Sequence, residues 1–233
     1  VSAMHAERFL HRDLKPGNIV MDGEVPRIAD FGTVRRMPPG QEIAPTSKHS
    51  KHSVTYRPPE AFGGTYTRLG DVYQVGIVAY QLLGGWLPMD GTEHFTKADH
   101  ADHSRLTDYV DRDLHIDRVI ERLATTGRLL RWATLPPWAT PAVRVLKRMT
   151  AVDPTARYQS ISDAAAALSR ARAAVADWER TADGYRLQKS TRVVELRRTA
   201  ADAYDVFVDA GAGPRCRRAS CGRRLKDLVA EFS

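Results

Sequence analysis

The chain has 233 residues, of which 42% are hydrophobic and 27% are charged, and its formal net charge is +7. These values are ordinary for a globular protein that is long enough to bury a substantial core. No apolar run of about eighteen residues occurs and no apolar stretch follows a basic N-terminus, which argues against a membrane segment and a signal peptide. Two cysteines cannot build a disulfide framework, and this favours a cytoplasmic protein.

The positive charge is concentrated near the C-terminus. Residues 170–233 contain fourteen Lys/Arg and nine Asp/Glu, which accounts for five of the seven net charges. A basic tail can bind nucleic acid, an acidic partner or acidic lipid. A solvated, arginine-rich surface is the interpretation we favour over these partners.

Two polar motifs lie near the N-terminus, His11-Arg12-Asp13-Leu14-Lys15-Pro16-Gly17-Asn18 and Asp30-Phe31-Gly32. Pro16-Gly17 predicts a loop in the first motif. The apolar residues 19–21 and 27–29, around the turn at Asp22-Gly23, predict a short β-hairpin. Such a hairpin would carry the two polar motifs.

The two motifs, in this order and at this spacing, resemble the catalytic and metal-binding loops of protein kinases. The resemblance implies transfer of a phosphoryl group from ATP, with Mg²⁺, to a hydroxyl group. It makes Asp13 the carboxylate that orients the hydroxyl and accepts its proton, and Lys15 the cation near the γ-phosphate. It makes Asn18 and Asp30 the ligands of Mg²⁺. Lys15, Asn18 and Asp30 would together contact the bound cofactor.

The same resemblance implies structural and regulatory roles in and after the two loops. His11 and Phe31 would stack in the core column that joins the two lobes, and Arg12 would receive a phosphate from the activation loop. Residues 32–55 have few large apolar side chains, which predicts a long mobile loop. The candidate regulatory hydroxyl groups in this loop are those of Thr46, Ser47, Ser50 and Ser53, of which Ser53 would contact the catalytic aspartate and lysine.

Three later segments resemble further kinase motifs. Pro58-Pro59-Glu60 resembles the end of the activation segment, and Asp153-Pro154-Thr155-Ala156-Arg157 resembles a segment whose arginine pairs with that glutamate. The resemblance therefore implies an ion pair between Glu60 and Arg157. Between them, residues 71–83 are apolar on nearly all sides, which predicts a buried helix. Asp71 at its start would bond the backbone of the catalytic loop.

Further helices are predicted over residues 110–132 and 141–149, and from Ser160 to about residue 176, where Ser160 and Asp163 have the spacing of a helix cap. Residues 90–104 are polar and predict a solvated insertion. The histidines of this insertion leave a metal site as an alternative; they are His94, His100 and His103.

The N-terminal lobe of a kinase carries a Gly-rich phosphate loop, and no G-x-G-x-x-G occurs in this sequence. Only ten residues precede His11. We therefore expect residues 1–172 to be a mainly α, kinase-like C-terminal lobe without its N-terminal lobe, which would have to be supplied in cis or in trans. A helix stub at residues 1–8 would then leave an apolar patch of the helix at 72–83 facing water.

Residues 173–233 resemble no family that we recognise. Strands are predicted at 184–188, 192–197 and 205–209 and a short helix at 225–232, which indicates a small β-rich extension or the start of a larger domain. Cys216 and Cys221 are free thiols or half of a zinc site. Residues 217–220 also resemble a basophilic phosphorylation site.

The function that we predict is that of a serine/threonine protein kinase with a protein substrate, since Lys15 follows the serine/threonine pattern. The alternatives are a non-catalytic C-lobe scaffold, a pseudokinase and the product of a truncated gene. A kinase of small molecules is a further class. Pro59-Glu60 and Arg157 argue against it, because such kinases generally lack this anchor.

Overall fold

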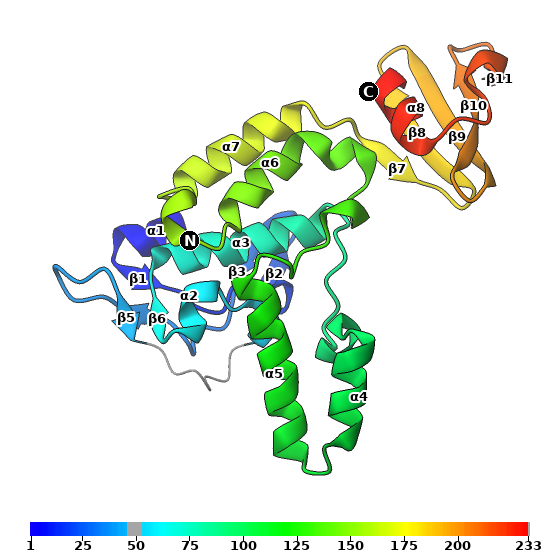
Figure 1. The fold of residues 1–233 in the computed structure, drawn as a ribbon. Coiled ribbons are helices and arrows are strands. Elements are labelled where there is room, and N and C mark those ends of the chain that lie inside the picture. Colours follow the sequence, from blue (N-terminus) through cyan, green and yellow to red (C-terminus); the bar gives the residue numbers. More distant parts are fainter. Residues whose placement is uncertain (46–52, 233) are drawn as a thin grey trace. The chain divides into compact units, whose positions relative to one another are not determined.

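The computed structural model describes residues 1–45 and 53–232. The regulatory residues Thr46, Ser47 and Ser50 lie outside this range. The described chain forms two compact units, one from Val1–Leu135 with Val143–Leu168, the other from Pro136–Ala142 with the chain from Ser169 onward (Figure 1). No helix within the described residues has the length and apolar character to cross a membrane.

The first unit begins with short elements that frame the two polar motifs. Strands β2 and β3 form the predicted antiparallel hairpin, with Ile19 opposite Ile28 and with Gly23 at a φ of +62° in its turn. Strand β1 pairs with β4 on the other side of the first motif. These elements are α1 (Ser2–Ala6), β1 (Phe9–Leu10), β2 (Ile19–Asp22), β3 (Val25–Ile28) and β4 (Arg35–Arg36).

The central helix of the first unit is α3, Arg68–Leu82, which begins at the cap residue Thr67. Val72, Ile77 and Tyr80 are fully buried along it. The expectation of an exposed apolar patch on this helix is therefore wrong, because the neighbouring elements of the same unit cover it. Two short elements precede it: β5 (Ala44–Pro45) pairs with β6 (Thr65–Tyr66), and α2 (Pro59–Phe62) lies between them in sequence.

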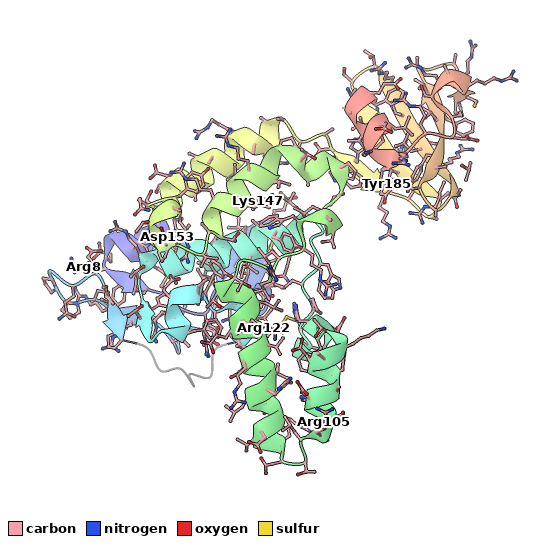
Figure 2. The ribbon with its side chains drawn as sticks, viewed as in Figure 1. Arg8, Arg105, Arg122, Lys147, Asp153 and Tyr185 are labelled. Carbon is pink, nitrogen blue, oxygen red and sulfur yellow. The ribbon has the colours of Figure 1, made fainter. Side chains whose placement is uncertain are left out.

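Residues 90–104 are mostly exposed, as predicted for a solvated insertion, but they are partly helical. They contain helix α4, Lys97–Arg105, which lies beside α5, Tyr109–Thr125 (Figure 1). Thr96 and Asp99 form a reciprocal capping box at the start of α4, and both Asp99 carboxylate oxygens accept hydrogen bonds from Arg122 of α5 at 3.0 and 2.9 Å (Figure 2). The long helix predicted up to residue 132 ends earlier because Gly127, at a φ of +69°, terminates α5.

Two further helices follow, α6 (Thr140–Met149) and α7 (Ile161–Ala173). The predicted cap of α7 is present, because Ser160 Oγ accepts a hydrogen bond from the backbone N–H of Asp163 at 3.0 Å. Residues 136–142, at the start of α6, belong to the second unit.

The second unit is a five-stranded antiparallel sheet in the order β11-β10-β9-β8-β7, and helix α8 packs on it. The three predicted strands and the terminal helix are present, and two short edge strands were missed. Val194, Val206 and Leu228 are fully buried in the core of this unit. Its elements are β7 (Trp178–Arg180), β8 (Gly184–Lys189), β9 (Arg192–Ala200), β10 (Ala203–Asp209), β11 (Arg215–Cys216) and α8 (Leu225–Phe232).

Candidate active site

The first polar motif forms a buried loop between β1 and β2 that brings Asp13, Lys15 and Asn18 together. Asp13 Oδ2 accepts hydrogen bonds from Lys15 Nζ at 2.7 Å and from Asn18 Nδ2 at 3.0 Å. Asn18 Nδ2 also donates to the backbone carbonyl of Asp13 at 2.7 Å. Asp13 Oδ1 is buried and has no hydrogen-bond partner among the described residues. One carboxylate oxygen is thus fixed and the other is left to accept a bond from a ligand.

Asp71, at the start of α3, binds the backbone of this loop and so supports it. It is fully buried and accepts hydrogen bonds from the backbone N–H groups of His11 and Arg12, both at 2.9 Å. Arg12 has a φ of +75°, which is uncommon for a residue with a side chain. The hydrogen bonds that Asp71 accepts from these two N–H groups therefore hold the loop in this conformation.

Three residues that sequence reasoning missed complete the support of the loop. The Tyr66 hydroxyl donates to Asp71 Oδ1 at 2.8 Å, and His5 Nε2 lies 2.7 Å from Asp71 Oδ2. Gln74 Oε1 accepts from the backbone N–H of Leu14 at 2.9 Å. Complete burial, together with the charge of Asp71, raises the pKa of Tyr66 well above its usual value, so that its hydroxyl remains a donor.

The second polar motif follows β3, at the same open end of the β2–β3 hairpin at which the first motif precedes β2. The backbone N–H of Ala29 donates to the carbonyl of Asn18 at 2.8 Å, which places Asp30 next to the end of the first motif. Asp30 is exposed, has a φ of +60°, and accepts a bond from the Gly32 N–H at 3.1 Å through Oδ1. Asn18 and Asp30 thus present an amide oxygen and a carboxylate at the same edge of the hairpin.

Phe31 lies beside His11, as the resemblance implies, with the two ring centroids 6.0 Å apart. His11 is fully buried, whereas Phe31 is 61% exposed. Of the two residues, only His11 is covered by the described residues of this chain.

Arg12 and Ser53 are the two described residues with predicted regulatory roles, and both precede α2 in the chain. Arg12 is partly buried, with its guanidinium carbon 5.8 Å from the ring centre of Tyr66, and this burial lowers the pKa of Arg12. Ser53 immediately precedes a 3-10 turn at Val54–Tyr56 and accepts a bond from the Tyr56 N–H at 3.1 Å through its carbonyl. Among the described residues no hydrogen bond joins Ser53 to Asp13 or Lys15.

Glu60 and Arg157 form the ion pair that the sequence predicts. Arg157 donates from Nη1 and Nη2 to the two Glu60 carboxylate oxygens at 2.8 and 2.7 Å. Arg157 is fully buried, and its other donors bond the carbonyls of Leu69, Ala151 and Val152. This arrangement fixes the start of α2 to the first turn of α3 and to the residues that follow α6.

The histidines of the α4 region pack against aromatic rings. His94 lies 5.3 Å from Trp86, and His100 and His103 lie 5.1 and 5.2 Å from Phe95. Within residues 1–45 and 53–232, no group of three or more His, Cys, Asp or Glu side chains has an arrangement that could hold a metal ion by itself. The zinc and histidine-metal alternatives therefore find no support in the described part of the chain.

Comparison with known proteins identifies the family to which the first unit belongs. Residues 1–169 match the model of the protein kinase domain, and the chain belongs to this family.

Its relatives are serine/threonine protein kinases. The chain is 29% identical over 170 residues to serine/threonine-protein kinase PrkC of Bacillus subtilis (strain 168), covering 70% of this chain and 22% of that protein. It is 26% identical over 167 residues to serine/threonine-protein kinase 32C of Mus musculus, covering 69% and 29%. It is 34% identical over 101 residues to serine/threonine-protein kinase pkn2 of Myxococcus xanthus, covering 39% and 12%. The chain thus spans less than a third of the length of these relatives.

Proposed function

We propose that this chain supplies the catalytic loop and the metal ligands of a serine/threonine protein kinase, which transfers the γ-phosphate of ATP to a hydroxyl group of a protein substrate. The observation that carries the proposal is the hydrogen bonding of the Asp13 carboxylate. Lys15 and Asn18 hold its Oδ2, while its buried Oδ1 has no partner among the described residues. A buried carboxylate oxygen without a partner is costly, and the bond from a substrate hydroxyl would satisfy it.

In this proposal Asp13 Oδ1 accepts the hydrogen bond of the substrate hydroxyl and takes up its proton as the oxygen attacks. Asn18 keeps the carboxylate in one orientation, since its amide bonds both the Asp13 side chain and the Asp13 carbonyl. Lys15 contributes a positive charge beside the reacting groups. The protein substrate provides the hydroxyl, and its identity depends on surfaces outside these residues.

The donor set at the hairpin edge fits Mg²⁺. This ion prefers oxygen ligands and is commonly bound through one or two protein oxygens together with the phosphates of a nucleotide. Asn18 retains its amide oxygen, because only Nδ2 is used in bonds to Asp13, and the Asp30 carboxylate is exposed. When bound, magnesium ATP supplies the phosphoryl group and a charge that offsets the negative charge of the transferred phosphate.

We further propose that residues 1–172 act as the C-terminal lobe of the kinase, residues 173–233 form an extension, and an N-terminal lobe in cis or in trans covers the hairpin. The sequence contains no Gly-rich phosphate loop of its own. Exposed apolar side chains on the hairpin and beside Asp30 support a surface that another lobe covers. They are Val20, Met21, Val25 and Phe31, which are 54–61% exposed.

The test is transfer of labelled phosphate from ATP to a protein substrate, by this chain joined to or mixed with its N-terminal lobe. We expect Asp13→Asn to lower the rate at least about 100-fold, because the amide cannot take up the proton. Asp22→Asn is the matched control, since Asp22 is an exposed carboxylate on the same hairpin that pairs only with Arg27, and it should leave the rate unchanged.

The 233 residues alone form a further arm of this experiment. We expect them to show no autophosphorylation and to bind ATP more weakly than about 1 mM, since the phosphate contacts of a Gly-rich loop are missing. Undiminished turnover by the Asp13→Asn enzyme would refute the catalytic role. Retained phosphate transfer by the 233 residues alone would instead refute the need for a second lobe.

A further inference from the structure

The two cysteines of the chain meet in the second unit. Cys216 lies in β11, and Cys221 follows the 3-10 turn at Arg218–Ser220. Their sulfur atoms are 3.3 Å apart, and both are free thiols, with Cys216 exposed and Cys221 partly buried. No other cysteine occurs in the sequence. The pair is far from the kinase motifs in sequence and has no part in the proposed catalysis.

Backbone structure holds the two thiols together. Cys216 is opposite Phe207 in the pairing of β11 with β10, and the neighbouring Val206 donates its N–H to Cys221 Sγ at 3.3 Å. The N–H of Arg217 donates to the Val206 carbonyl at 2.7 Å, so that the loop between the cysteines is also bound to β10. Both cysteines are thus held against adjacent residues of β10, the strand next to the edge strand β11.

The chemistry of the two thiols differs. Cys216 is exposed at an edge strand and can meet a solute, whereas Cys221 is bonded to Val206 and lies close to the carbonyl of Arg217 at 3.4 Å. Burial raises the pKa of the Cys221 thiol. This asymmetry suits a pair in which one thiol attacks and the other resolves.

We propose that Cys216 and Cys221 are a peroxide-sensitive thiol–disulfide site. The Cys216 thiolate attacks an oxygen of the peroxide, the O–O bond breaks, and the released hydroxide takes up a proton to form water. Cys221 then attacks the sulfur of the resulting sulfenic acid. The S–O bond breaks, the S–S bond forms, and the leaving hydroxide takes the proton of Cys221 as a second water. The two thiols are oxidised and the peroxide is reduced, and a thiol reductant reverses the change.

The disulfide closes a short loop that is already connected to α8. Ser220 Oγ donates to Glu231 Oε1 at 3.1 Å, and Arg217 Nη2 lies 3.4 Å from the same oxygen. A sulfur–sulfur bond of about 2.0 Å needs only a small approach of the two atoms. Because the cross-link reduces the freedom of the unfolded chain, it stabilises the second unit.

This geometry also bears on the phosphorylation site that residues 217–220 resemble. The Ser220 side chain is 2% exposed and bonded to Glu231, so the folded unit does not offer it to an enzyme. The loop that resembles a phosphorylation site is therefore better placed for thiol chemistry.

The test is treatment of the reduced chain with hydrogen peroxide, followed by intact-mass measurement and thiol counting. We expect a monomer that has lost two hydrogen atoms and both free thiols, and that regains them with dithiothreitol. Trypsin can cut after Arg217 and Arg218, between the two cysteines, so the fragments on either side should stay joined until they are reduced. The oxidised chain should also melt a few degrees higher than the reduced one.

Two variants separate the roles of the thiols. Cys221→Ser should stop at the sulfenic acid of Cys216 or proceed to higher oxides, while Cys216→Ser should consume peroxide at least about tenfold more slowly. Circular dichroism checks that both variants fold. The tryptic fragments of the oxidised wild-type chain test the disulfide without either variant. Wild-type protein that forms only disulfides between chains, or only higher oxides, would overturn the proposal.

Discussion

Four polar contacts converge on the single carboxylate of Asp71, and this explains how a loop with an unfavourable backbone conformation is maintained. The contacts come from the backbone of His11 and Arg12 and from the side chains of Tyr66 and His5. All lie in a region from which water is excluded, where an unmatched donor costs more than a matched one gains. The position of Asp13 therefore depends on a residue that would not itself touch a substrate.

We expect Asp71→Asn to lower the free energy of unfolding by about 2–4 kcal/mol, because an amide can accept bonds with only one oxygen and leaves buried donors unmatched. Urea denaturation followed by circular dichroism measures this. Asp22→Asn is the control, and its change should stay within about 0.5 kcal/mol, since both partners of the Asp22–Arg27 pair are about two-thirds exposed. A loss no larger than that of the control would show that Asp71 is not the support of the loop.

Two ion pairs of similar length differ in how far their side chains are buried. Arg157 is fully buried and its pair with Glu60 measures 2.7 Å, while the Arg105–Asp102 pair on α4 measures 2.8 Å with both side chains mostly exposed. Removing one partner of a buried pair leaves a charge without compensation, whereas an exposed pair contributes little.

We therefore expect Glu60→Gln to lower the free energy of unfolding by about 3 kcal/mol and Asp102→Asn to lower it by less than about 0.5 kcal/mol. Differential scanning calorimetry of the two variants beside the parent chain gives both values. Equal effects would mean that the carbonyls around Arg157 are sufficient to stabilise it without Glu60.

At the scale of elements, the paired helices α4 and α5 depend on Asp99, which caps α4 and binds Arg122 of α5. Partial burial alone would raise the pKa of Asp99. The hydrogen bonds from Thr96 and the pair with Arg122 outweigh this and lower the pKa below its usual value. A carboxylate with a lowered pKa in the folded state contributes stability above its unfolded-state pKa of about 4, and this contribution is lost as the pH falls through the folded-state pKa.

The expected result is a lower melting temperature for Asp99→Asn than for the parent chain at pH 7, with a gap that narrows once the pH falls below about 4. Melting curves at a series of pH values test this. Asp102→Asn, on the same helix, should show no such pH-dependent gap. If the difference in melting temperature between Asp99→Asn and the parent chain stays constant at acidic pH, the shape of the Asp99 side chain, and not its charge, accounts for its effect on stability.

The elements that could be predicted from sequence are those with a local signal. The apolar helix α3, the hairpin β2–β3 and the cap at Ser160 each have one. The contact between Glu60 and Arg157 was implied by the resemblance of their segments to kinase motifs. Gln74 and Tyr66 were missed because single polar residues beside an apolar helix show nothing of the loop that they bind. Strands β7 and β11 are too short for a pattern to emerge. Helix α4 is rich in His and Asp, and a tertiary partner, Arg122, stabilises it instead of an apolar face.

At the scale of the whole molecule, aromatic residues that lie close in sequence belong to different units. Trp132 contacts Tyr80 in the first unit, with ring centroids 5.4 Å apart, and Trp138 contacts Tyr185 of strand β8 in the second unit, with ring centroids 5.0 Å apart. If each unit has its own core, these two tryptophans report on separate unfolding events.

We expect two thermal transitions in calorimetry. Trp138→Ala should lower the melting temperature of one transition, and Trp132→Ala should lower that of the other. For Trp138, a partly buried ring, we expect a loss of about 2 kcal/mol in the free energy of unfolding of its unit. Each variant is the control for the other, because the residue type and substitution are the same. A single transition that both variants shift alike would mean that the two units unfold as one.

The short segment Pro136–Ala142 has a consequence for the newly made chain. It belongs to the sheet unit, yet the ribosome synthesises it before most of α6 and all of α7, which complete the other unit. Trp138 therefore emerges without its ring partners and stays uncovered until β7 and β8 have followed. Synthesis from the N-terminus cannot finish one unit and then begin the next, so a pause or a cut between α6 and β7 leaves both of them incomplete.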